Sequence, residues 1–136
     1  MAVVAPQPVT VTRAVDLATA GPFLARALSH DVAWPGDLED TVRGCAVFEL
    51  RRGPDVVGAF AAKVDRYKTG TALMVTAAGA APGADVLGSM CDWIEQQARD
   101  VVRARQAQCL TARPGLVRAL KARGYRIGGY FMTKDV

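Results

Sequence analysis

The alternation of apolar and polar residues along the chain predicts strands in its first half. Apolar residues recur at every second position over 8–15 and 45–51, a period typical of strands with one buried face. Residues 56–64 place the larger side chains of Val56, Phe60 and Val64 on one strand face and mostly small residues on the other. The sequence Arg52-Gly53-Pro54-Asp55 is a turn signal, so the second and third segments are expected to form an antiparallel hairpin. Residues 71–77 are mainly apolar and β-compatible, and they predict a short buried strand.

Apolar residues at intervals of three and four predict the main helix. Asp85 is expected to cap it, and one face of the helix is apolar through Val86, Leu87, Met90, Trp93, Ile94 and Ala98. Shorter helices are expected over 17–20, capped by Asp16, and over 23–29, with a break at Gly21-Pro22 between them. A further helical turn is expected over 37–40.

The C-terminal third predicts a strand, a helix and a last strand. The first strand spans 107–112, and Pro114 then opens a helix that Gly124 ends. The last strand is expected over 125–134, with a bulge or bend at Gly128-Gly129. The resulting order, β-α-α-β-β-β-α-β-α-β, predicts an α/β fold with a mixed sheet flanked by helices. We expect a flexible lead-in over 1–7 and a single domain over 8–136.

Composition and cysteine content narrow the class of protein. The chain has 136 residues, of which 51% are hydrophobic, and it is long enough to bury a core. No apolar run reaches the roughly 18 residues of a membrane span. Cys45, Cys91 and Cys109 are widely spaced among apolar neighbours, so they are expected to be reduced core residues of a cytoplasmic protein. With His30 as the one histidine, a His-based zinc cluster is excluded and no metal site is expected.

The net charge of +4 is unevenly distributed. Nine of the 17 basic residues follow position 98, against the two acidic residues Asp100 and Asp135. This segment is either the solvated side of two helices or a surface for an anion, a nucleotide or a nucleic acid. Few aromatic residues accompany the arginines, which argues against a surface that stacks bases.

Two loops carry the candidate chemistry. Residues 78–84 hold two glycines and a proline between the 71–77 strand and the main helix. Such a loop either presents backbone N–H groups to a phosphate or is a plain turn. Residues 30–44, which include Trp34, form either a lid over a substrate or a simple connection.

The element order, with the closing sequence Leu116-Val117-Arg118-Ala119-Leu120-Lys121-Ala122-Arg123-Gly124-Tyr125 and the final Phe131-Met132-Thr133-Lys134, resembles the GNAT superfamily of acetyl-CoA-dependent N-acetyltransferases. The resemblance covers about residues 8–134. It implies a mostly antiparallel sheet whose fourth and fifth strands splay around acetyl-CoA. Backbone groups of the fourth strand and its loop would hold this cofactor, and in this chain those residues are Val75, Ala77, Gly79, Ala81, Gly83 and Ala84.

The chain departs from the family pattern at several motif positions. The loop lacks the family's basic or amide residue, and Ala81 stands where the family has its first glycine. Leu120 and Arg113 stand where the family often has tyrosine and asparagine. The resemblance then leaves Glu49 or Asp65 as candidates for the general base and Tyr130 or Tyr67 for the acid. The acceptor would be the amine of a small molecule or a protein.

The same departures allow a second interpretation, in which the fold has lost catalysis and serves as a binding or structural module. The chain resembles small GNAT-like proteins of tailed bacteriophages, some of which travel inside the virion. Its place would then be the cytoplasm or a phage particle, and its partner a protein or a second copy. The 71–77 strand and the last strand could also form an intersubunit sheet. Binding of nucleic acid by the basic segment is a third alternative.

Overall fold

The computed structural model describes residues 7–28, 37–111, 113–130 and 132–136. Residues 1–6 of the expected lead-in over 1–7 lie outside these residues, as does the part of the 30–44 loop that holds His30 and Trp34. The elements, in order, are β1 (Val9–Arg13), α1 (Leu17–Leu28), α2 (Leu38–Val42), β2 (Ala46–Arg52), β3 (Asp55–Tyr67), β4 (Gly70–Ala80), α3 (Leu87–Gln96), the π-helical turn η1 (Gln97–Val102), β5 (Gln106–Cys109) and α4 (Pro114–Ala122).

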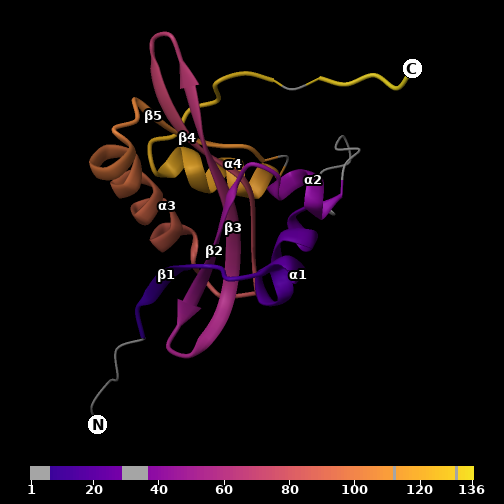
Figure 1. Cartoon of the computed structure of the whole chain (residues 1–136), viewed down its shortest axis with the longest axis vertical. Helices are drawn as coiled ribbons and strands as arrows, with labels where there is room; N and C mark the ends of the chain where they lie inside the picture. The colour runs from indigo at the N-terminus through magenta and orange to yellow at the C-terminus, as the bar shows by residue number, and fades with distance from the viewer. Residues whose placement is uncertain (1–6, 29–36, 112, 131) are drawn as a thin grey trace.

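The strands form one five-stranded sheet in the order β1-β2-β3-β4-β5 (Figure 1). The first four strands are antiparallel to their neighbours, and β5 runs parallel to β4. The predicted hairpin is confirmed, because β2 and β3 pair through the turn at Gly53, whose φ is +60°. The α/β fold class with a mixed, mostly antiparallel sheet is confirmed as well.

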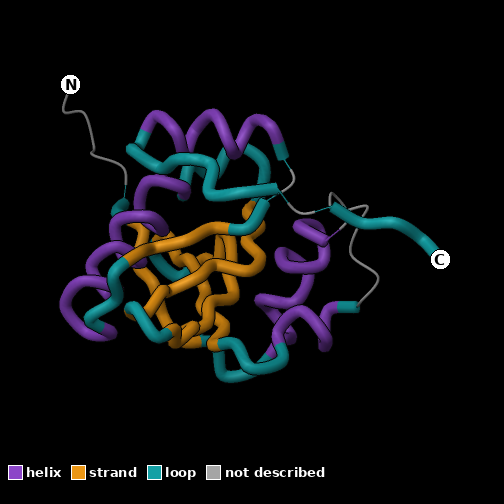
Figure 2. The backbone as a smooth tube through the Cα atoms, turned by 90° about the horizontal axis from the view of Figure 1, so that it is seen from above, coloured by secondary structure: helices purple, strands orange, loops and turns teal. Residues whose placement is uncertain are grey.

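Helices cover both faces of this sheet, and the strands lie between them (Figure 2). On one face, Ala20 and Leu24 of α1 pack against Ala59 and Ala77. On the other, α3 and α4 contribute Met90, Ile94 and Leu120 to a larger cluster with Phe60 and Val75. Each large side chain buried in this way contributes about 1.5–3 kcal/mol. Among the described residues, no helix is long and apolar enough to cross a membrane.

The three aromatic residues Phe48, Phe60 and Trp93 join α3 to the sheet. The Phe48 and Phe60 rings stack with centroids 5.2 Å apart, and the Trp93 centroid lies 4.6 Å from that of Phe48. Trp93 therefore occupies the core position that the helical spacing predicts, half-buried over the middle of the sheet.

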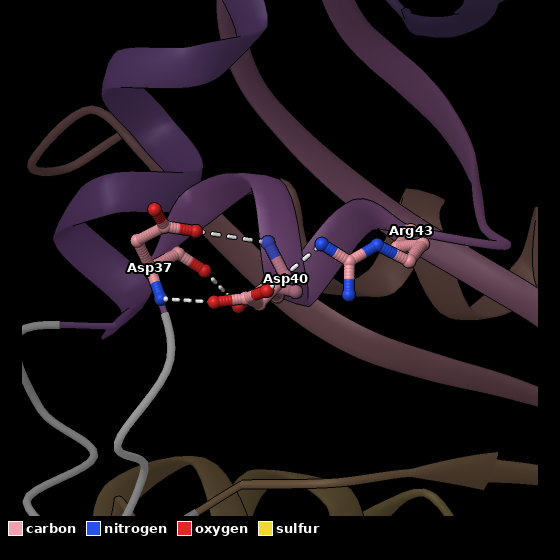
Figure 3. A network of polar contacts seen from close by, with 4 residues as sticks. Asp37, Asp40 and Arg43 are labelled. Atoms are coloured by element: carbon pink, nitrogen blue, oxygen red, sulfur yellow. Dashed lines mark hydrogen bonds and ion pairs between the residues drawn. The ribbon is translucent and has the colours of Figure 1, made fainter.

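Side-chain bonds of Asp16 and Asp37 cap the starts of α1 and α2, where the sequence predicts helical turns to begin. Asp16 Oδ1 accepts from the Ala18 amide at 2.9 Å. Figure 3 shows a capping box at α2, in which the Asp40 amide donates to Asp37 Oδ1 and the Asp37 amide donates to Asp40 Oδ2. The bond from the Asp37 backbone is the main reason that the pKa of Asp40 is lowered, and Arg43 adds to it.

Three sequence predictions are wrong. Gly21-Pro22 does not break the first helix, since α1 continues through Pro22. The physical reason is that Ala20 and Leu24, on either side of Pro22, are buried against the sheet and hold the helix there. Asp85 does not cap α3, since its φ of +51° places it outside the helix and Val86 takes the cap position without a side-chain bond. The strand expected over 125–134 is absent from its described residues, which pair with no strand.

Candidate functional site

β5 pairs with the first half of β4 and separates from it after Val75. They pair from Ala72 to Val75, and the last bond across them runs from the Leu110 amide to the Val75 carbonyl at 3.0 Å. Beyond this point β4 continues to Ala80, while β5 gives way to the segment that leads into α4. Within the described chain, the part of β4 after Val75 thus has β3 as its strand partner on one side and no strand on the other. We call this unpaired side of residues 76–80 the open edge.

A bulge decides which backbone groups this open edge presents. The β3–β4 register shifts so that Ala62 faces Val75 and Ala61 faces Ala77, which makes Thr76 the extra residue. After the bulge, the Ala81 amide donates to the Val57 carbonyl of β3, so alternate residues before it, Gly79 and Ala77, also face β3. The backbone groups of Ala78 and Ala80 consequently point toward the open edge.

Arg113 reaches this open edge from the start of α4. Its Nη2 donates to the Ala78 carbonyl at 2.9 Å, and its own amide donates to Thr111 Oγ1 at 3.1 Å. The residue is the N-cap of α4, is half-buried, and precedes Pro114, which fixes the first helical turn. A guanidinium group therefore lies beside the part of β4 that β5 leaves unpaired.

The loop after β4 is a tight turn followed by an uncapped helix. The Ala84 amide donates to the Ala81 carbonyl at 3.1 Å across Pro82 and Gly83, whose φ is +73°. A side chain at Gly83 would meet no atom within 4 Å, so the space above it is open. The first amides of α3 have no acceptor within the helix and no side-chain cap, which leaves them available to an anion.

The six residues named for the cofactor lie along this continuous segment but differ in what they offer. Val75 and Ala77 belong to the paired and buried part of β4, and Ala84 is buried below the loop. The backbone groups of Gly79 and the amide of Ala81 face β3, and the Ala81 carbonyl is used within the turn. Gly83 is exposed, with open space above it. These six residues remain a prediction, and nothing in the sequence indicated that Ala78, Ala80 and Arg113 would face the open edge.

The candidate catalytic residues are not brought together. Glu49 is buried on the α1 face and pairs with Arg51 Nη2 at 3.3 Å. It lies opposite Ala59, which lies opposite Gly79, so two strand spacings, about 10 Å, separate it from β4. Asp65 lies at the other end of β3, beside Lys63 at 3.5 Å. Tyr130 is 87% exposed in the segment after α4, and Tyr67 ends β3 and is also exposed.

A polar cluster between α3, β5 and α4 was not anticipated from the sequence. Tyr125 Oη donates to Glu95 Oε2 at 3.2 Å, and Arg123 pairs with Asp92 and Glu95. Burial raises the pKa of the Cys109 thiol to about 12, with further contributions from Cys91 and Glu95. Burial likewise raises the pKa of Cys91. Both thiols are free and protonated at neutral pH, so this cluster holds elements together and contains no thiolate nucleophile.

Comparison with known proteins identifies the fold. No protein-family model matches the sequence, and no curated protein matches it either. Among solved structures, a possible acetyltransferase from Clostridium difficile 630 superposes with a TM-score of 0.71 over 94% of this chain and 97% of its own, at 10% identity. An aminoglycoside N-acetyltransferase solved in complex with CoA gives a TM-score of 0.60 over 99% of both chains, at 12% identity. A GNAT family acetyltransferase from Staphylococcus aureus gives 0.57 over 94% and 98%, at 8% identity. The fold of this chain is therefore the GNAT fold.

Proposed function

We propose that this chain binds a CoA thioester along the open edge of β4 and transfers its acyl group to an amine. The observation that carries the proposal is the parting of β4 and β5 after Val75 in a chain with the GNAT fold. The edge offers the backbone groups of Ala80, the open space above Gly83 and the uncapped start of α3. Two features oppose an anion there, since Pro82 has no amide to donate and Asp85 adds a negative charge.

The reaction needs one bond to form and one to break. The nitrogen of the acceptor amine attacks the thioester carbonyl carbon, the carbon–sulfur bond breaks, and CoA leaves as a thiolate. The amine gives up a proton to a general base, and the thiolate gains one from an acid. Of the two carboxylates named for the base, we favour Glu49. It lies opposite Ala59 on β3, which in turn lies opposite Gly79 on the open half of β4, whereas Asp65 lies at the other end of β3. The acid remains Tyr130 or Tyr67, and the acceptor is a small molecule or a protein.

The test is calorimetric titration of the protein with acetyl-CoA and CoA. Replacing Gly83 by glutamate places a charged side chain in the open space above the loop, so Gly83→Glu should abolish saturable binding. Gly44→Glu is a matched control, because Gly44 has a φ of +75° against +73° at Gly83 and also has nothing within 4 Å. The control thus introduces the same backbone strain and charge away from the turn at Gly83, because the start of β2 lies near Ala62 and Val75, whereas that turn lies near Val57. Absence of binding to the unaltered protein at millimolar ligand would refute the proposal.

A second candidate is a non-catalytic binding or structural module. What favours it is the separation of Glu49, Asp65 and Tyr130, together with the bond that Arg113 makes to the Ala78 carbonyl on the open edge. Such a module would act on a protein partner or a second copy, as the resemblance to virion-associated phage proteins implies. Binding of CoA without acetyl transfer to any of a panel of amines, or no binding at all, would favour this candidate over the enzyme.

A further inference from the structure

Arg113 carries a charge that the described part of the chain does not neutralise. Ion pairs form at Arg43, Arg51, Lys63, Arg99 and Arg123. By contrast, no carboxylate of the described residues lies within 4.0 Å of the Arg113 guanidinium, and its side-chain partner there is the neutral carbonyl of Ala78. A guanidinium group binds an anionic acceptor more strongly than an uncharged carbonyl, so the acceptor that Arg113 has is the weaker kind.

The position of Arg113 places that charge in the candidate site. Nη2 lies 2.9 Å from a carbonyl that the Thr76 bulge turns toward the unpaired edge of β4. Arg123, which lies near Gly88 in the first turn of α3, is already paired with Asp92 and Glu95. The loop over 78–84 has no basic residue of its own. Arg113 therefore places at this edge a positive charge that no carboxylate of the described residues neutralises.

We propose that Arg113 is the oxyanion-binding residue of the site and that it exchanges the Ala78 carbonyl for an oxyanion of the bound thioester. This inference rests on the proposed function, because it concerns the ligand of the same edge. A phosphate or carboxylate carries an opposite charge and can accept two parallel bonds from the guanidinium group, whereas the Ala78 carbonyl is uncharged and accepts one, which favours the exchange. The exchange also frees the Ala78 carbonyl to accept from the ligand. The oxyanion is either a phosphate of CoA or a carboxylate on the acyl group.

The experiment titrates four thioesters into the full chain and its variants. Acetyl-CoA carries phosphates alone, succinyl-CoA carries phosphates and an acyl carboxylate, S-succinylpantetheine carries the carboxylate alone, and S-acetylpantetheine carries neither. The variants are Arg113→Ala, which removes both the charge and the bond, and Arg113→Gln, which keeps a donor for the Ala78 carbonyl. Arg118→Gln is the control, because Arg118 is an exposed arginine on the same helix. Thermal melting confirms that each variant is folded.

We expect Arg113→Ala and Arg113→Gln to weaken binding of each thioester that carries the recognised oxyanion by about tenfold or more. Arg118→Gln should change it little. S-acetylpantetheine should bind Arg113→Ala as well as it binds the unaltered protein, or more tightly, because the Ala78 carbonyl is then free. Loss confined to the CoA thioesters identifies a phosphate, and loss confined to the succinyl compounds identifies a carboxylate.

Two outcomes separate this inference from the proposed function. If the unaltered protein binds none of the four thioesters, the proposed function fails and the inference fails with it. If the unaltered protein binds, but the Arg113 variants bind all four with unchanged or uniformly reduced affinity, the site stands and the role of Arg113 is refuted. The dependence of acetyl-CoA affinity on salt is a further readout, since loss of a phosphate contact should make it shallower in Arg113→Gln.

Discussion

At the scale of single residues, Gly79 shows how packing sets the shape of the site. An added Cβ at Gly79 would lie 2.0 Å from the Phe23 carbonyl oxygen of α1, so the backbone of α1 rests directly on β4. The sequence alone favours a phosphate-binding role for Gly79, because a glycine after a strand suits a phosphate loop as well as close backbone packing. The structure shows instead that Gly79 is needed for close packing against Phe23 of α1. Because Phe23 is distant from Gly79 in the sequence, the residues around Gly79 do not reveal this contact. The role of Gly83 was easier to predict, because a glycine after a proline is typical of a turn that requires a positive φ.

Replacing Gly79 by alanine should destabilise the protein by about 1–3 kcal/mol, because two backbone segments would have to separate to admit one methyl group. Gly128→Ala is the control, since a Cβ there meets nothing within 4 Å. Urea denaturation of both variants provides the measurement. Equal stability of Gly79→Ala and the unaltered protein would mean that α1 does not sit against β4 as described.

At the scale of elements, the end of α4 separates what the sequence could predict from what it could not. Gly124, with a φ of +94°, ends the helix in a motif where the Tyr125 amide donates to the Leu120 carbonyl and the Gly124 amide to that of Lys121. That stop is local, as is the capping box at Asp37, and both were predictable. The strand expected after it depended on a neighbour to pair with, and the residues over 125–134 carry no information about whether that neighbour is available.

A chain that ends at Tyr125 should be as stable as the full chain to within about 0.5 kcal/mol, because substitutions and losses at exposed positions have small effects. Residues 126–130 and 132–136 are exposed, and Tyr130 and Met132 are 87% and 88% accessible. Tyr125 is retained because it packs on the core. Urea denaturation at several protein concentrations measures the difference. A loss of several kcal/mol would show that the predicted last strand forms in solution, either on its own β5 or on a second copy.

At the scale of the whole molecule, the sequence predicted the sheet and its helical layers but only part of the site. The order of elements follows from periodicity and turn chemistry, which are encoded locally. The open edge depends on the Thr76 bulge, on the end of β5 pairing at Cys109 and on the reach of Arg113, and these arise only when distant segments meet. No residue pattern near Thr76 marks the bulge, so the alanines of β4 could not be assigned to one edge or the other in advance.

The cluster that joins α3, β5 and the end of α4 gives the whole fold a dependence on pH. Burial raises the pKa of Cys109 from 9.0 to about 12, and burial first, then Cys91, Cys109 and Glu95, raises that of Tyr125. A group whose pKa is raised by folding loses its proton more readily in the unfolded chain. Its contribution to stability is therefore complete below its pKa in the unfolded chain, which is 9.0 for Cys109, and is lost as the pH rises through its pKa in the folded protein.

The free energy of unfolding should accordingly be flat from pH 7 to pH 8.5 and should fall above about pH 9. Cys109→Ala should make that fall shallower, whatever its effect at neutral pH, because one of the titrating groups is gone. Cys45→Ala is the matched control, since Cys45 precedes β2 and lies outside the cluster of Cys91, Cys109 and Tyr125. Urea denaturation at intervals from pH 7 to pH 10.5 gives the slopes. If Cys109→Ala and Cys45→Ala show the same slope as the unaltered protein, the Cys109 thiol does not titrate with folding, and the junction between α3 and β5 is more open to water than its burial indicates.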